Sequence, residues 1–284
     1  MKITGGNELD TKITVDATGY WKDGFTIVRN VFSRQEIEEL REAAYASRDV
    51  GPGDLLSKPR MRHVLLDGRL VEITRQVLGR DDIVYYGDSA FTITPGKTGY
   101  HKDNADRTDR NAPDWKDPYT QVRLGIYLQD HYRHSGGLNV RQGSHNKISL
   151  QHGDTVYLRT RVGDVGVWSL RTSHSGAGTL LRFPRWWHPS PANAKRLPGF
   201  LVAPPERDRI SVFAALGADD EHAERYVDYL KTRTYMVNSF RASHYDDEVY
   251  PLAERIGLRI RDVGKEIAGD PLVGRNEGWE PIPY

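Results

Sequence analysis

The chain has 284 residues and a formal net charge of +1. This length suits one large domain or two small ones, and the near-neutral charge predicts neither nucleic-acid nor membrane partners. The absence of cysteine excludes disulfides, thiolate metal sites and a cysteine nucleophile. The start of the chain lacks a signal-peptide pattern, and no apolar run approaches the roughly 18 residues of a membrane span. These features predict a cytoplasmic protein and leave its oligomeric state open.

The N-terminal part of the chain predicts one strand and two helices. A β-rich run covers residues 25–28. Ser33 and Glu36 have the spacing of a capping box, and apolar residues follow at helical spacing, which predicts a helix over 33–48. A second amphipathic pattern predicts a helix over 69–78.

From residue 82 onward the pattern changes to short strands separated by turn residues. Segment 121–129 alternates between an apolar face and a face that carries Arg123 and Tyr127. That second face either lines the mouth of a barrel or faces solvent, and the pattern leaves both open. Further strands are expected at 83–94, 137–141, 155–158, 165–170 and 210–216. Short strands without interleaved helices predict a mainly β core, a sandwich or barrel, over about 82–217.

The last part of the chain predicts helices over 219–232 and 252–267. We expect the C-terminal helices within 219–284 to pack outside the β-core, so that 1–284 forms a single domain. The Pro-rich segment 176–206 cannot be a central strand. Since long ordered loops in compact domains are usually functional, we interpret it as an insertion or lid beside the site.

Three residues have the pattern of a mononuclear iron site. His101 and Asp103 stand two positions apart, and alternate residues of an extended strand project to the same side. His174, on a later strand, supplies a second imidazole. Two imidazoles and one carboxylate on one face of Fe(II) leave the other face open for a co-substrate and O2. We therefore predict that these three residues are metal ligands and form the catalytic centre.

Four segments in order resemble the phytanoyl-CoA dioxygenase family of Fe(II)/2-oxoglutarate oxygenases. The first contains the strand that leads into the first helix, the second contains the His-x-Asp pair, and the last contains the distal Gly-Asp…His motif. The other resembles the family's Gly-x-Leu…Pro-Gly-Ser-His turn, with Gln142 where proline is usual. The segments are 20–33, 101–103, 136–145 and 163–176. The resemblance spans roughly residues 20 to 217.

The resemblance implies a double-stranded β-helix, a cupin-like jelly roll with flanking α-helices. It also implies Fe(II), 2-oxoglutarate and O2 as cofactors, and an arginine that binds the far carboxylate of 2-oxoglutarate, as a guanidinium does well. The family's usual spacing points to Arg185, but no strand follows it. Arg209 opens the strand 210–216, so we favour Arg209. Arg123 and Tyr127 are further candidates for co-substrate contact.

The substrate is expected to be a small polar or anionic metabolite, because the remaining candidate residues are polar or aromatic. These candidates are Asn139, Arg141, Arg171, Trp186, Trp187 and His188. His131 and His145 are possible ligands, although His145 is better explained as a turn residue. The implied reaction is an oxidation, hydroxylation by default, with release of succinate and CO2. The alternative is a metal-binding jelly roll without oxidative chemistry, such as a sugar isomerase or a binding module.

Overall fold

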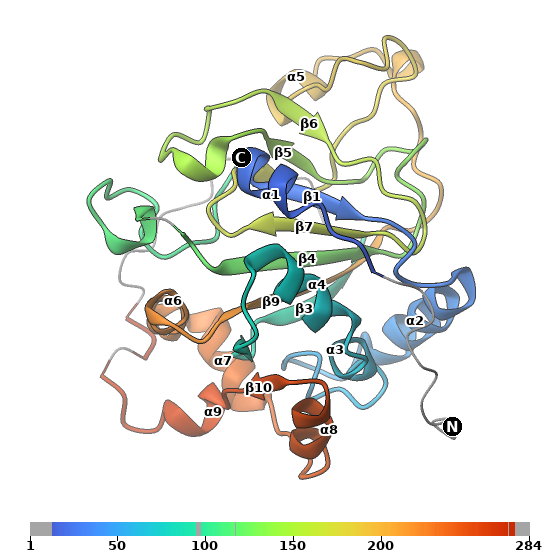
Figure 1. The fold of residues 1–284 in the computed structure, drawn as a ribbon. Helices are drawn as coiled ribbons and strands as arrows, with labels where there is room; N and C mark the ends of the chain where they lie inside the picture. Colours follow the sequence, from blue (N-terminus) through green and yellow to red (C-terminus); the bar gives the residue numbers. More distant parts are fainter. Residues whose placement is uncertain (1–12, 95–97, 117, 272, 276–284) are drawn as a thin grey trace.

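The computed structural model describes residues 13–94, 98–116, 118–271 and 273–275. Two β-sheets form the centre of the molecule (Figure 1). The larger has the order β1 (Phe25–Val28), β7 (Val165–Ser169), β4 (Gln121–Tyr127), β9 (Ile210–Ala218), β2 (Ile83–Tyr85), β10 (Leu258–Ile260), with β3 (Ser89–Ile93) also paired with β9. The smaller has the order β6 (Thr155–Tyr157), β5 (Asn139–Arg141), β8 (His174–Ser175). The pairing of these strands is antiparallel except between β2 and β10.

The two sheets face each other across a small apolar core. Tyr127 and Trp168 come from the larger sheet and Val140 from the smaller one, and all three are buried in one cluster. Face-to-face antiparallel sheets with mixed side chains between them are the architecture of a jelly roll. The predicted fold class is therefore confirmed.

Helices cover the outer face of the larger sheet. α1 (Ala17–Asp23), α2 (Arg34–Ser47), α3 (His63–Leu66) and α4 (Arg69–Leu78) share its largest core cluster. The capping box at α2 forms as predicted, because Ser33 Oγ accepts from the Glu36 amide while Glu36 accepts from the Ser33 amide. Since the apolar face of β4 packs in this cluster, Arg123 and Tyr127 must point to the opposite, inner face.

A second group of helices follows β9 at the opposite end of the view from α5 (Pro191–Ala194) (Figure 1). It consists of α6 (Glu221–Thr232), α7 (Thr234–Ala242), α8 (Val249–Arg255) and α9 (Val263–Glu266). Single 3-10 turns lie at Pro113–Trp115, Ser144–Asn146 and Gly199–Leu201. Among the described residues, none of the helices combines the length and the apolar character needed to cross a membrane.

Several expected elements differ from those observed. The helix predicted over 252–267 is wrong, since β10 interrupts it and joins the larger sheet beside β2. The strand predicted over 83–94 is divided into β2 and β3 at Gly87, whose φ of 82° breaks the extended chain. α1 and α7 were not predicted, and the β-core extends beyond 82–217 because β1 and β10 complete its edges.

Candidate metal centre

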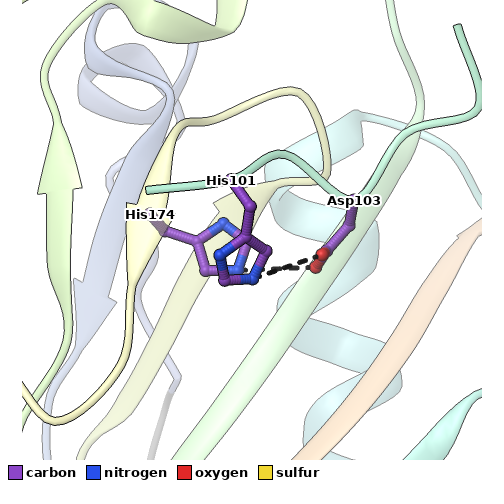
Figure 2. Close-up of side chains that lie close together, drawn as sticks. All are labelled: His101, Asp103 and His174. Atoms are coloured by element: carbon purple, nitrogen blue, oxygen red, sulfur yellow. Dashed lines mark ion pairs between the residues drawn. The ribbon is translucent and has the colours of Figure 1, made fainter. Parts of the chain in front are cut away.

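His101, Asp103 and His174 converge on one point, as Figure 2 shows. One ligand atom from each lies within 4.8 Å of the others. His101 Nε2 is 3.8 Å from Asp103 Oδ1, and His174 Nε2 is 3.6 Å from Asp103 Oδ2. The three residues predicted from the sequence are therefore brought together by the fold.

Backbone hydrogen bonds set these positions. His101 and His174 form a β-bridge in which each amide donates to the other's carbonyl, at 3.0 and 2.9 Å. The Asp103 amide donates to the Leu170 carbonyl at 2.9 Å. The segment 101–103 is thus a single bridge followed by a loop rather than the regular strand that we predicted. His101 is nevertheless held by pairing with His174 at the start of β8. Asp103 is held by its bond to Leu170, which directly follows β7.

The imidazoles present their Nε2 atoms to the centre of the site. His101 Nδ1 lies 3.0 Å from the Gly99 carbonyl, and His174 Nδ1 lies 3.0 Å from the Thr172 carbonyl. Because a carbonyl only accepts, each Nδ1 carries the proton and each Nε2 keeps its lone pair. A backbone acceptor behind the ring is the usual support of a metal-binding histidine. The donor set fits a divalent iron ion, with two imidazoles and one carboxylate.

Burial and nearby charges tune the ionisation of the ligands. Burial lowers the pKa of His174 to about 4, so its ring is neutral near pH 7. Burial opposes ionisation of Asp103, but its interactions with His174 and with the Arg123 guanidinium outweigh burial and hold the pKa of Asp103 well below its usual range. His174 therefore offers a neutral nitrogen and Asp103 an ionised oxygen, the protonation states that a metal requires.

Arg123 fixes the carboxylate of Asp103 from the floor of the barrel. Its Nη2 is 3.2 Å from Asp103 Oδ2, and its Nη1 is 2.9 Å from Asp88 Oδ2. Asp88 in turn accepts a hydrogen bond of 2.7 Å from the Tyr226 hydroxyl. Burial alone would lower the pKa of Arg123, but these neighbouring charges raise it. The question left open for this face of β4 is settled, since Arg123 faces the site and not solvent.

Arg209 is a buried cation at the start of β9. Its Nε donates to the Gly136 carbonyl and its Nη1 to Ser211 Oγ, and its guanidinium lies 5.5 Å from the centre of the Tyr127 ring. Among the described residues, no carboxylate lies within ion-pair distance of it, and burial lowers its pKa. The Tyr127 hydroxyl is also buried without a partner in the described part of the chain. A buried cation without a counter-charge is unfavourable unless an anion binds there.

Other predicted site residues already have structural partners. Arg171 donates to the Asp114 carbonyl, and its guanidinium lies 5.0 Å from the centre of the Tyr119 ring, so we leave it out of the proposed site. Arg141 donates to the carbonyls of Gln151 and Gly153, which fixes a loop.

Three other candidate site residues are His145, His131 and Asn139, and each has its own set of neighbours. His145 Nε2 donates to the Trp21 carbonyl, in line with a turn role. His131 lies 2.8 Å from Gln129 Nε2, and neither histidine belongs to the metal cluster. Asn139 is buried beside Pro189, and its Oδ1 has no partner among the described residues, so it remains a candidate for substrate contact.

The segment 176–206 protrudes from the smaller sheet. Its base is held by a β-bridge between Leu181 and Val202. Beyond the base, Trp186 is 81% exposed, whereas His188 is half-buried. Arg185 is exposed and reaches the rest of the molecule through its backbone carbonyl, which accepts from Arg159. These positions favour Arg209 over Arg185 as the internal cation.

Sequence reasoning missed Asp88 and Tyr226. Asp88 lies in the turn between β2 and β3, and Tyr226 lies on α6, 138 residues further along the chain. No local pattern marks either residue, because their role arises only from the contact of distant segments with Arg123.

Comparison with known proteins adds a sequence relative. No family model matches the chain. The chain is 29% identical over 148 residues to the ectoine dioxygenase of Nocardia farcinica, an alignment that covers 44% of this chain and 48% of that protein. The chain thus matches about half the length of this curated relative.

Solved structures share the fold over most of the chain. One is EctD from S. alaskensis with 2-oxoglutarate and 5-hydroxyectoine, with a TM-score of 0.51, 17% identity, and coverage of 76% of this chain and 80% of that one. Another is HygX from Streptomyces hygroscopicus with nickel and 2-oxoglutarate, with a TM-score of 0.50, 18% identity, and coverage of 70% and 85%. A third is the α-ketoglutarate-dependent epimerase SnoN from nogalamycin biosynthesis, with a TM-score of 0.52, 16% identity, and coverage of 71% and 79%. The similarities confirm the resemblance that the sequence motifs predicted, and the structures establish the fold.

Proposed function

We propose that this protein is an Fe(II)/2-oxoglutarate-dependent dioxygenase that oxidises a small polar metabolite and releases succinate and CO2. The observation that carries the proposal is the pairing of two features in one barrel. His101, Asp103 and His174 form a three-ligand site with free Nε2 atoms, and the same barrel buries the guanidinium of Arg209 without a counter-charge among the described residues. A metal-binding module without a co-substrate would need the first feature but not the second.

The metal would be held by Nε2 of His101, Nε2 of His174 and the Asp103 carboxylate. Bound Fe(II) supplies the redox chemistry that couples O2 and 2-oxoglutarate to substrate oxidation. Arg123 would keep Asp103 ionised and oriented, since it donates to Oδ2 and is itself held by Asp88. Trp168, whose ring centre is 5.5 Å from that of His174, would exclude water from the inner side of the site.

The co-substrate would bind between the metal ligands and Arg209. Its far carboxylate would pair with the guanidinium, and the unpartnered Tyr127 hydroxyl would be a second donor. Ser211 already fixes one nitrogen of Arg209, which orients the remaining donors. This arrangement satisfies two buried groups at once, which supports 2-oxoglutarate as the anion.

The substrate would lie under the protruding segment. Asn139 offers a buried acceptor at its base, and Trp186 and His188 would cover a bound molecule if the segment closes. Exposed aromatic side chains on a loop beside a site are suited to such closure. Arg141 would act only indirectly, through the loop that it fixes. A cytoplasmic location belongs to the same proposal, supported by the absence of cysteine.

The test is succinate release from 2-oxoglutarate in the presence of Fe(II), O2 and a panel of metabolites. Ectoine is the first compound to include, because the curated relative is an ectoine dioxygenase. The proposal predicts succinate formation that needs Fe(II) and rises with at least one small polar metabolite. Iron-independent conversion of a sugar, with no succinate, would favour the isomerase alternative instead.

A further inference from the structure

Arg107 is a cation beside the metal centre that has no acidic partner in the part of the chain that the structure describes. It follows Asp103 by four positions on the loop before β4. Its Nη1 donates to the Lys102 carbonyl at 3.5 Å, and its Nη2 is buried without a hydrogen-bond partner among the described residues. No carboxylate of the described chain lies within ion-pair distance of it. An arginine that is held in place but not neutralised is a candidate for binding an anion.

Two acids of the same loop, Asp106 and Asp114, are already bound to α6. Arg225 on α6 forms ion pairs with Asp106 and with Asp114. Asp114 also accepts from Asn104 at 3.1 Å. Asp106 and Asp114 therefore join the loop to α6, and neither of them forms an ion pair with Arg107.

The C-terminal helices place aromatic rings and a second arginine beside Arg107. Its guanidinium lies 5.5 Å from the centre of the Tyr229 ring on α6. Arg233, between α6 and α7, lies 5.5 Å from the same ring and 5.6 Å from that of Tyr235. We call Arg107, Tyr229, Arg233 and Tyr235 the Arg107 cluster. It combines two cations with two rings, which is the chemistry that binds a planar or ring-bearing anion.

A continuous chain of contacts connects the cluster to the metal ligands. The Tyr229 ring centre is 6.3 Å from that of Tyr226. The Tyr226 hydroxyl is 3.2 Å from Arg123 Nη2, which is itself 3.2 Å from Asp103 Oδ2. The cluster therefore belongs to the surroundings of the reactive centre.

Tyr235 shows that solvent reaches the cluster. Its side chain is 62% exposed. A small molecule can therefore reach this ring of the cluster from solvent.

We propose that the Arg107 cluster is the recognition site for a negatively charged group of the substrate, so that the substrate is a small anion with a ring or planar body. Arg107 pairs with the carboxylate or phosphate, and Tyr229 and Tyr235 contact the body. That the bound anion is the substrate rests on the proposed function. Anion binding by the cluster is a separate property and can be measured without turnover.

The experiment uses calorimetry with matched charged and neutral probes. The protein is loaded with Ni(II) and excess 2-oxoglutarate so that the metal and Arg209 are engaged, and phenyl phosphate and benzoate are compared with phenol and benzamide. We expect at least one anion to bind about tenfold or more tightly than its neutral counterpart, since a hydrogen bond to a charged group contributes roughly 1.5–3 kcal/mol. Arg107→Gln should weaken that binding by a similar factor.

Arg110→Gln is the matched control, because Arg110 is exposed on the same loop three positions further on. It should bind the probes as the unchanged protein does. Equal binding of charged and neutral probes by the unchanged protein, or equal loss in the two variants, overturns the inference. Repeating the titration on metal-free protein with Arg209→Gln separates the sites: retained binding supports the cluster, whereas abolished binding assigns the anion to Arg209. Failure to bind Ni(II) and 2-oxoglutarate would instead count against the proposed function.

Discussion

The metal centre and the protruding segment 176–206 are both connected to the smaller sheet, but they are built in opposite ways. At the metal centre, backbone bonds between His101 and His174 and the ion pair of Arg123 with Asp103 fix nearly every donor. In the protruding segment, Phe183, Trp186 and Phe200 are each more than 70% exposed. Figure 1 shows this segment, with α5, extending from the sheets.

This contrast indicates that the metal centre is rigid, whereas the protruding segment can change its conformation. Donors that must meet a metal within tenths of an ångström are held by backbone hydrogen bonds to the ends of strands. Aromatic side chains that have few contacts can change position at little energetic cost, as closing loops do. Substitutions should therefore affect the two regions in different ways, and the predictions below run from the largest effect to the smallest.

The largest effect is expected at the three ligands. Replacing His101, Asp103 or His174 by Ala should lower Fe(II)-dependent succinate release by more than about a hundredfold, since even an outer partner of a ligand contributes 10–100-fold. Circular dichroism should show an intact fold, because the backbone bonds between His101 and His174 remain. Full activity in any of the three variants would refute the ligand assignment.

The next effect separates the two candidate arginines. Arg209→Ala should raise the 2-oxoglutarate concentration needed for half-maximal rate, with a loss of about 2–5 kcal/mol for a buried ion pair. Arg185→Ala is the control, since Arg185 is exposed and should leave this constant unchanged. The measurement is the rate of succinate release as a function of 2-oxoglutarate concentration in both variants. If Arg185→Ala shows the loss, the last core strand does not carry the co-substrate arginine.

An effect on the stability of the rigid core is small near neutral pH and grows as the pH falls. Burial, with the Arg209 charge, lowers the pKa of His131 to about 3, so the folded protein holds this ring neutral where the unfolded chain protonates it below about 6.5. Stability should therefore fall as the pH drops from about 6.5 towards 3, by up to about 1.4 kcal/mol per pH unit from this group. Urea unfolding at several pH values should give a shallower dependence for His131→Gln. Identical slopes in both proteins would contradict the buried neutral state.

The smallest effect on stability is expected in the protruding segment. Trp186→Ala should change the free energy of unfolding by less than about 0.5 kcal/mol, because the side chain is 81% exposed. If the segment closes over substrate, the variant should raise KM. Limited proteolysis should then show that Fe(II), 2-oxoglutarate and substrate protect 176–206. If the ligands do not change cleavage within 176–206 and Trp186→Ala does not change KM, the segment does not close over the substrate.

The same contrast explains what the sequence could predict. The capping box of α2, the alternation of β4 and the His-x-Asp pair are local signals, and each appears in the structure as expected. β10 and Asp88 depend on contacts between segments that are far apart in the chain, so periodicity could not reveal them. The helix expected over 252–267 failed for this reason, since pairing with β2 outweighs the helical pattern of the isolated segment.

Anaerobic addition of Fe(II) and 2-oxoglutarate to the purified protein tests the central claim most directly. A metal held by His101, Asp103 and His174 with chelated 2-oxoglutarate should develop a visible absorption band that neither Fe(II) nor 2-oxoglutarate gives alone. The band should be absent in His174→Ala, and in Arg209→Ala it should need more 2-oxoglutarate. A folded protein that binds Fe(II) but gives no band at saturating 2-oxoglutarate would contradict the account and favour a metal-binding jelly roll without oxidative chemistry.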